Sequence, residues 1–175
     1  LNAEPTTYTD TGARNLAIGY QSLKQLTYGH NNTAIGYNAG QNVRAVNSTA
    51  DLASHNTAIG AESLNGDAGD GSRNTAVGSK ALNMNKNGDD NTVLGYNAGN
   101  AITDGSENIC IGSGIASGLT TGYNNIYIGY GQTGSIGTGN YFNTINLGNN
   151  DTANFYCKVP ITTTSDERLK KDIEP

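Results

Sequence analysis

One five-residue motif, Asn-Thr-Ala-Ile-Gly, recurs along the sequence, and this repetition limits what the chain can fold into. The motif stands unchanged at residues 32–36 and 56–60, and at 74–78 and 91–95 with other aliphatic residues in its apolar positions. Looser copies begin at Asn15, Asn108, Asn125 and Asn143, which makes eight copies. Such self-similarity indicates a repeat architecture in which each unit packs on its neighbours.

The repeat unit keeps one length over much of the chain. A Gly-x-x-Asn-x-x-x-Gly frame begins at Gly12, Gly29, Gly71, Gly88, Gly105 and Gly122, and four of these steps are equal. A unit of about 17 residues cannot hold the paired helices of helical repeats, and it lacks an apolar stripe at helical spacing. We therefore predict an all-β fold, a stacked parallel β-roll with two short strands in each coil.

Side chains within each motif are predicted to alternate between two faces of a strand. Thr33, Ile35 and Tyr37 face one way, while Asn32 and Ala34 face the other. Stacking would align the second bulky position of every copy into an aliphatic column. Its members are Ile18, Ile35, Ile59, Val77, Leu94, Ile111, Ile128 and Leu147. A coil of this size has little interior, so a column that lies outside it would be buried between chains. The sequence does not decide whether the column lines the coil interior or the axis between the chains.

The repeated asparagines are predicted to form a ladder. In a stack each residue lies over its counterpart in the next coil, about 4.8 Å away. Because an amide side chain both donates and accepts hydrogen bonds, Asn32 and Asn56 can bond each other and satisfy the turn backbone. The abundant glycine, 24 residues in all, permits tight turns and close approach of the coils.

Composition and charge exclude several partners. The formal net charge of −5 argues against nucleic acid and anionic membrane surfaces. No apolar run reaches about eighteen residues, so no membrane insertion is expected. Cys110 and Cys157 share no metal-binding or redox spacing and are interpreted as unpaired thiols.

The repeat frame divides the chain into four parts. Residues 1–11 are expected to be an irregular leader or the end of a preceding segment, and residues 12–148 the repeat domain, with an extended loop at 41–54. Residues 149–164 are expected to form an extended tip segment. Charge density rises at 165–175, which indicates the start of another domain. Since the chain does not begin with methionine, we expect it to be a fragment.

Two interruptions of the period are the candidate binding regions, because insertions in repeats tend to lie on exposed loops. For the loop at 41–54 the simpler interpretation is a tolerated insertion without a partner. The aromatic residues of the glycine-rich stretch 129–143 can stack on sugars or pack on a neighbouring chain, and packing is favoured. The candidate binding residues are Arg44, Asp51, His55, Tyr130, Tyr141 and Phe142.

Motifs of an enzyme or a metal centre are missing from the sequence. It contains no nucleophile elbow, Walker loop, zinc-protease motif or paired-carboxylate pattern. Turn carboxylates such as Asp89 and Asp104 are interpreted as solvated rather than as calcium ligands. His30 and His55 are interpreted as surface residues, since the frame places no third ligand. We expect no enzyme activity, no metal and no cofactor.

Residues 12 to about 148 resemble the Asn-Thr-Ala-Ile-Gly β-roll repeats of phage tail fibres, bacterial fibre proteins and, more distantly, the heads of trimeric autotransporter adhesins. Ser165 to Ile173 resemble the opening of the intramolecular chaperone, classed as peptidase S74, that ends many phage tail spikes and fibres. The resemblance implies an extracellular homotrimeric fibre, with its three chains intertwined or side by side, on a virion tail or a bacterial surface. Its chaperone would align three chains and then cut itself off.

The same resemblance implies a self-cleavage site. The family's cut precedes the Ser of Ser-Asp-x-Arg-Leu-Lys, here between Thr164 and Ser165, with Ser165 and Lys170 as the matching dyad. Only eleven residues of the chaperone are present, so cleavage is not expected. By spacing alone, these residues equally fit a helix start capped by Ser165.

These observations favour an adhesive fibre tip that presents loops to a cell-surface glycan or outer-membrane protein of a host or prey cell. A rigid fibre spacer, with recognition elsewhere in the parent protein, is the first alternative. A polysaccharide-degrading tail spike is the second, and the missing acid pair argues against it.

Overall fold

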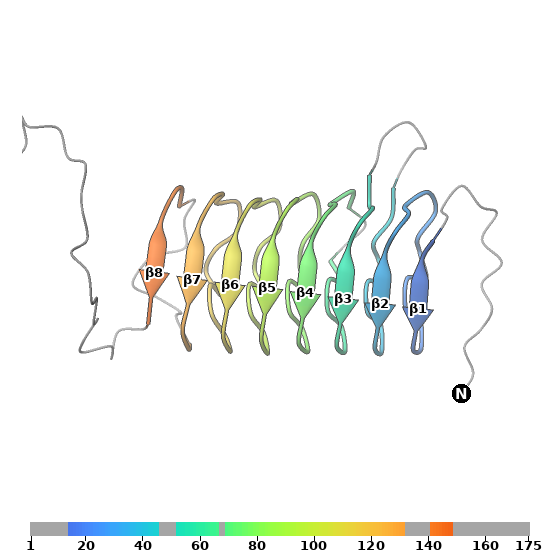
Figure 1. Ribbon diagram of the computed structural model, residues 1–175, viewed down its shortest axis with the longest axis horizontal. Coiled ribbons are helices and arrows are strands. Elements are labelled where there is room, and N and C mark those ends of the chain that lie inside the picture. The colour runs from blue at the N-terminus through green and yellow to red at the C-terminus, as the bar shows by residue number, and fades with distance from the viewer. Residues whose placement is uncertain (1–13, 46–51, 67–68, 132–140, 149–175) are drawn as a thin grey trace, which may run out of the picture.

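The computed structural model describes residues 14–45, 52–66, 69–131 and 141–148, which form one β-solenoid. Eight parallel strands form a single sheet in the order β1 to β8 (Figure 1). They are β1 (Leu16–Ile18), β2 (Thr33–Ile35), β3 (Thr57–Ile59), β4 (Thr75–Val77), β5 (Thr92–Leu94), β6 (Ile109–Ile111), β7 (Ile126–Ile128) and β8 (Ile145–Leu147). The predicted segments 1–11, 149–164 and 165–175 lie outside the described residues.

Like residues lie over like residues in the stack. In the pairing of β2 with β3, Thr33 lies opposite Thr57, Ala34 opposite Ala58 and Ile35 opposite Ile59. From β4 to β7 the step between coils is 17 residues, as in the bond from Asn108 to Asn91. The predicted all-β parallel stack and its repeat length are therefore confirmed.

The middle residue of each strand from β2 to β7 points into the coil. This inner column is completely or almost completely buried from β2 to β7 and consists of Ala34, Ala58, Ala76, Val93, Cys110 and Tyr127. It packs against apolar side chains from the far side of the coil, which include Leu23, Leu64, Leu82, Ile102, Ile115 and Leu119. A thin core therefore runs along the rod, and packing between coils supplies the order.

The prediction of two strands in each coil is wrong for the part of the chain described, where each coil holds one three-residue strand. The segment after the motif glycine still bonds from coil to coil, since the N–H of Leu64 donates to the carbonyl of Ala81 at 2.9 Å. However, alternate residues there have left-handed φ angles, 56° at Glu62 and 46° at Leu64. Such angles curl the backbone into consecutive turns and prevent an extended strand.

The last copy of the motif is shifted by one residue from the sequence prediction. Ile145 of β8 lies opposite Ile126 of β7, so Thr144 and not Asn143 stands over Asn125. The N–H of Thr144 donates to Oδ1 of Asn125 at 3.0 Å. The asparagine ladder therefore ends at Asn125, because a hydroxyl occupies the next position.

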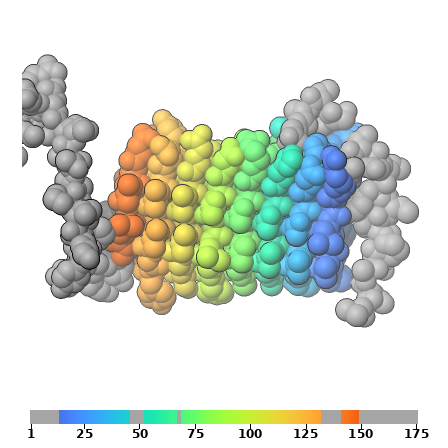
Figure 2. Space-filling view, viewed as in Figure 1, coloured from blue at the N-terminus to red at the C-terminus, as the bar shows by residue number. Residues whose placement is uncertain are grey.

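The coils pack directly against one another along the rod (Figure 2). A side chain at the motif glycines would prevent this, since a Cβ on Gly60 would lie 2.6 Å from the carbonyl of Gly78. Among the described residues, no helix is long and apolar enough to cross a membrane.

Candidate functional site

The outward face of the sheet carries the aliphatic column predicted from the sequence. Each member is the residue directly after an inner-column residue in the same strand, so its side chain points away from the coil interior. Several are strongly exposed, among them Ile18 at 53%, Leu94 at 47% and Ile128 at 41%. The structure thus places this column outside the coil, on the surface of the chain.

A second column lies beside it, formed by the residue before each inner-column residue. It consists of Leu16, Thr33, Thr57, Thr75, Thr92, Ile109, Ile126 and Ile145. Threonine fills the middle of this column, and isoleucine fills its C-terminal part. Ile145 is among the most exposed aliphatic side chains described.

A third column follows the motif glycines. Backbone bonds fix its register, as where the N–H of Glu62 donates to the carbonyl of Tyr37 at 2.8 Å. The column consists of Tyr20, Tyr37, Ala61, Ser79, Tyr96, Ser113 and Tyr130. The rings of Tyr20 and Tyr37 stack with centroids 5.6 Å apart and planes 9° from parallel.

We call these three columns together the sheet face. None of their residues is charged, and most are aliphatic or aromatic. At a rise of about 4.8 Å for each of the coils and about 3.3 Å for each residue along a strand, the face covers roughly 38 Å by 16 Å. Apolar patches of such extent mark interaction sites in soluble proteins.

The edge of the sheet before each strand is polar and bonded from coil to coil. Asn32, Asn56, Asn74, Asn91, Asn108 and Asn125 form the predicted ladder, and all are buried. The side chain of Asn91, for example, donates to Oδ1 of Asn74 at 3.0 Å and to the carbonyl of Gly105 at 2.8 Å. The predicted bonding between stacked asparagines is therefore confirmed.

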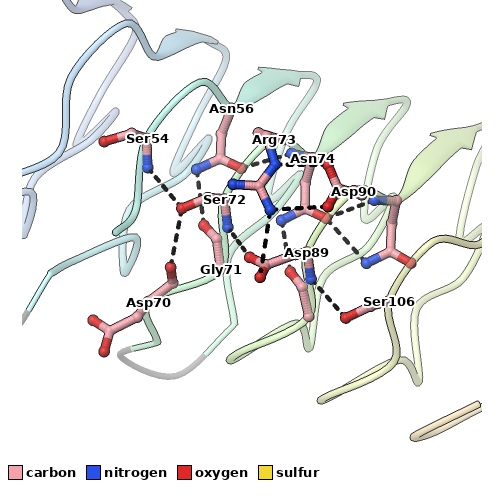
Figure 3. A network of polar contacts seen from close by, with 12 residues as sticks. Ser54, Asn56, Asp70, Gly71, Ser72, Arg73, Asn74, Asp89, Asp90 and Ser106 are labelled. Atoms are coloured by element: carbon pink, nitrogen blue, oxygen red, sulfur yellow. Dashed lines mark hydrogen bonds and ion pairs between the residues drawn. The ribbon is translucent and has the colours of Figure 1, made fainter. Parts of the chain in front are cut away.

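A second ladder lies two residues before the asparagines (Figure 3). The N–H of Ser54 donates to Oγ of Ser72 at 3.2 Å, and the N–H of Ser72 donates to Oδ1 of Asp89 at 2.7 Å. The N–H of Asp89 then donates to Oγ of Ser106 at 3.0 Å. Each of these side chains satisfies a turn amide of the preceding coil.

Arg73 joins this edge to the neighbouring carboxylates (Figure 3). Its Nε and one terminal nitrogen donate to both oxygens of Asp90, at 2.7 and 2.9 Å. The hydrogen bond from Arg73 lowers the pKa of the Asp90 carboxyl, and the positive charge adds to this effect although partial burial opposes it. These carboxylates therefore have structural partners, and the described residues contain no group of three His, Cys, Asp or Glu placed to hold a metal.

Comparisons with protein-family models, curated proteins and solved structures found no match to this chain. The geometry of the chain itself therefore carries the functional argument.

The candidate binding residues do not converge on one site. Arg44 is partly buried in the coil after β2, and its N–H donates to the carbonyl of Gly69 at 3.4 Å. Tyr130, which is 70% exposed, ends the third column of the sheet face. His55 lies on the polar edge before β3 and is exposed.

Tyr141 and Phe142 lie at the β8 end of the rod. Phe142 packs on Tyr123 with ring centroids 4.4 Å apart. Tyr141 is partly buried against the core, and its carbonyl accepts a bond from the side chain of Asn125 at 2.7 Å. The described contacts of both residues are packing contacts and a hydrogen bond within the chain. Asp51, Ser165 and Lys170 lie outside the described residues.

The proximity of His30 and His55 was not predicted from the sequence. They are the two histidines of the chain and stand on either side of a long insertion, yet their ring centroids are 5.6 Å apart. The repeat unit between them is longer than the others. Its extra residues break the regular frame, from which contacts between residues of neighbouring coils were predicted.

Proposed function

We propose that this chain is a non-enzymatic segment of an extracellular homotrimeric fibre, and that three copies pack through their sheet faces. The observation that supports the proposal is the uncharged sheet face, on which an aliphatic column remains partly exposed along the whole rod. A mostly apolar, uncharged surface of this extent lies at the upper end of the patches found on monomeric proteins, and such patches often mark interaction sites.

A second copy of the chain is the partner that the periodicity favours. The strands of neighbouring coils pair in one continuous parallel sheet, so the coils are evenly spaced along the rod. A second copy has the same spacing and can therefore pack its columns against the columns of the first copy in every coil. The face measures roughly 600 Å² in plan, close to the roughly 800 Å² that each partner buries in a typical stable interface. The number three comes from the resemblance to trimeric fibre proteins.

Light scattering tests the assembly. We expect a mass three times the chain's 18.2 kDa. Replacing Ile35 and Ile59 with Asp would bury unpaired charge in the interface and should yield monomers. Met84→Asp is the matched control, because Met84 is an exposed apolar residue on the turn side of the coil, and it should leave the mass unchanged. A monomeric parent chain, or a trimeric Ile35→Asp/Ile59→Asp variant, would contradict the proposal.

We further propose that the fibre attaches to a cell-surface glycan or outer-membrane protein. A glycan array and a cell-binding assay with the assembled fibre test this role. Deletion of residues 46–51, which spares the buried core residues Val43, Ala45 and Ala53, should weaken attachment if the interruptions of the repeat carry recognition. Replacement of Tyr141 and Phe142 with Ala should weaken it likewise. Attachment that survives these changes would favour a rigid spacer, a role supported by the wide separation of the candidate binding residues along the rod.

A further inference from the structure

Two asparagines of the described chain stand directly before a glycine, Asn65 before Gly66 and Asn87 before Gly88. The backbone nitrogen that follows an asparagine can attack the side-chain amide and expel ammonia, which makes asparagine a chemically labile residue. A glycine at that position has no side chain to hinder the approach. The sequence gives both pairs the same reactivity, whereas the structure separates them.

The peptide group between Asn87 and Gly88 is held by no hydrogen bond within the described part of the chain. Neither the carbonyl of Asn87 nor the N–H of Gly88 has a partner there. The side chain of Asn87 is exposed, and its Nδ2 donates to Oδ1 of the exposed Asp104 at 2.7 Å. Since water can replace a hydrogen bond at the surface at little cost, the amide can turn towards the Gly88 nitrogen.

The other end of Gly88 is anchored. Its carbonyl accepts bonds from the side chains of Asn74 and Asn85, at 2.8 and 2.9 Å, and both donors are buried. The Gly88 nitrogen therefore keeps its place while the neighbouring Asn87 side chain rotates in solvent. Holding one reacting group in place beside the other favours ring closure between them.

Asn65 has a different environment, although it also precedes a glycine. Its backbone carbonyl accepts a bond from Nδ2 of Asn42 at 3.1 Å, and its own Oδ1 is buried. Gly66 is buried as well. Rotation of this amide would disturb packed groups, and water has less access to the reaction product.

Asn124 provides a matched comparison of the opposite kind. It is exposed, and its Nδ2 donates to Oδ1 of Asn143 at 2.7 Å, as that of Asn87 does to Asp104. The nitrogen that follows it belongs to Asn125, whose N–H donates to the asparagine ladder at 3.1 Å. The two sites therefore share exposure and a side-chain bond and differ in the nitrogen that would attack.

We propose that Asn87 is a deamidation site in the folded chain. The Gly88 nitrogen loses its proton to solvent and bonds to Cγ of Asn87, and the side-chain nitrogen takes up a proton and leaves as ammonia. The product is a succinimide ring. Water opens this ring at either carbonyl, which gives an aspartate or an isoaspartate whose backbone runs through the former side chain. This inference is independent of the proposed trimer and of attachment to cells.

Either product should weaken the contact between neighbouring coils. A carboxylate at residue 87 cannot donate to Asp104, and the two negative charges repel each other. An isoaspartate also adds one carbon atom to the backbone directly before Gly88, where the stacked coils leave no room for even a Cβ. Deamidation should therefore loosen the rod around β5, whose strand lies between residues 87 and 104.

Incubation of the full chain at about pH 8.5 and about 37 °C tests the site. Mass spectrometry of its peptides assigns the gain in mass to single asparagines. Asn87 should react at least about tenfold faster than Asn65 and Asn124. An isoaspartate-specific methyltransferase should label the peptide that contains residue 87, and the thermal midpoint of the chain should fall as the products accumulate.

Asn87→Thr is the blocking variant, because Thr121 stands before the glycine of the repeat frame two coils further on. This variant should lose the methyltransferase label and keep its thermal midpoint during incubation. Asn124→Gly is the control, since glycine suits the φ of 54° at that residue, and it should be labelled as the parent chain is.

Incubation in guanidinium chloride separates the effect of structure from that of sequence. In the unfolded chain Asn65 and Asn87 should react at similar rates, because the groups that protect Asn65 are no longer packed around it. Absence of reaction at Asn87 in the folded chain would overturn the proposal. Folded-state reaction at Asn65 or Asn124 as fast as at Asn87, or labelling that persists in Asn87→Thr, would do the same.

Discussion

The backbone N–H and the side-chain amide of Asn125 both donate to one oxygen, Oδ1 of Asn108, at 3.1 and 3.0 Å. The same amide also donates to the carbonyl of Tyr141 at 2.7 Å. A side chain with both a donor and an acceptor is needed to continue the ladder in both directions. An aspartate of the same shape has no donor while ionised, so shape alone cannot replace the amide.

We predict that Asn125→Asp destabilises the fold by about 3 kcal/mol or more, because a buried carboxylate would face the Asn108 and Tyr141 oxygens. The control is Asn124→Asp, at the exposed neighbouring residue, which should cost no more than about 1 kcal/mol. Urea unfolding at one fixed protein concentration measures both. Equal losses in the two variants would mean that the ladder does not carry the expected energy.

The contact between coils at Gly88 gives a second prediction. A Cβ on Gly88 would lie 2.1 Å from the carbonyl oxygen of Gly105 and 2.4 Å from Oδ1 of Asn85, whereas a Cβ on Gly118 would meet no atom within 4 Å. Gly88→Ala should therefore cost about 4 kcal/mol or more, and Gly118→Ala less than about 1 kcal/mol. Thermal unfolding followed by circular dichroism separates the two. A small loss of stability in Gly88→Ala would show that the coils can move apart at Gly88 with little cost in free energy.

The buried thiol of Cys110 predicts a pH dependence. Burial raises its pKa from 9.0 to about 12, so the folded chain keeps a proton that the unfolded chain releases. The resulting contribution to stability is complete below pH 9 and is lost as the pH rises from 9 towards 12.

Relative to Cys110→Ala, the parent chain should therefore lose up to about 1.4 kcal/mol of unfolding free energy for each pH unit above the thiol's ordinary pKa. Denaturant unfolding of both proteins between about pH 8 and 10 measures the difference, in which the other titrating groups largely cancel. A difference that stays constant with pH would indicate that the native thiol ionises normally.

The ion pair of Arg73 with Asp90 should contribute little. Both side chains are more than 40% exposed, and solvent screens their attraction. We expect Asp90→Asn to cost less than about 1 kcal/mol at neutral pH and nothing measurable in about 1 M salt. Because the pKa of Asp90 is lowered, this contribution is present above the ordinary carboxyl value of 3.8 and is lost as the pH falls through the lower folded pKa. A loss of several kcal/mol would assign the pair a larger structural role.

Much of the fold could be predicted because the governing rules are local. Alternation within residues 32–36 correctly separated inward Ala34 from outward Ile35. The requirement that stacked amides bond each other correctly identified the asparagine ladder. The second side of the coil could not be predicted in the same way, since Leu64 and Leu82 have the composition of a short strand but adopt left-handed φ angles.

The candidate sites were less predictable than the fold. Interruptions of the repeat indicated exposed loops, yet Tyr141 proved to be partly buried and Arg44 lies in a different coil. The proximity of His30 and His55 had no signal in the sequence beyond their position at the ends of one lengthened unit. The aliphatic column was predicted, but its place outside the coil was not.

The sequence by itself determined that the coils repeat, that like residues stack and that Asn32 and its counterparts bond one another. Those features follow from period-two alternation and from a constant repeat length. The tertiary structure alone decided which residues meet across an insertion, such as His30 and His55, and that Thr144 closes the ladder. The physical reason is that extra residues in a repeat unit change which residues of neighbouring coils face each other. The new pairing depends on the conformation of every turn in the coil, and the tertiary structure alone fixes those conformations.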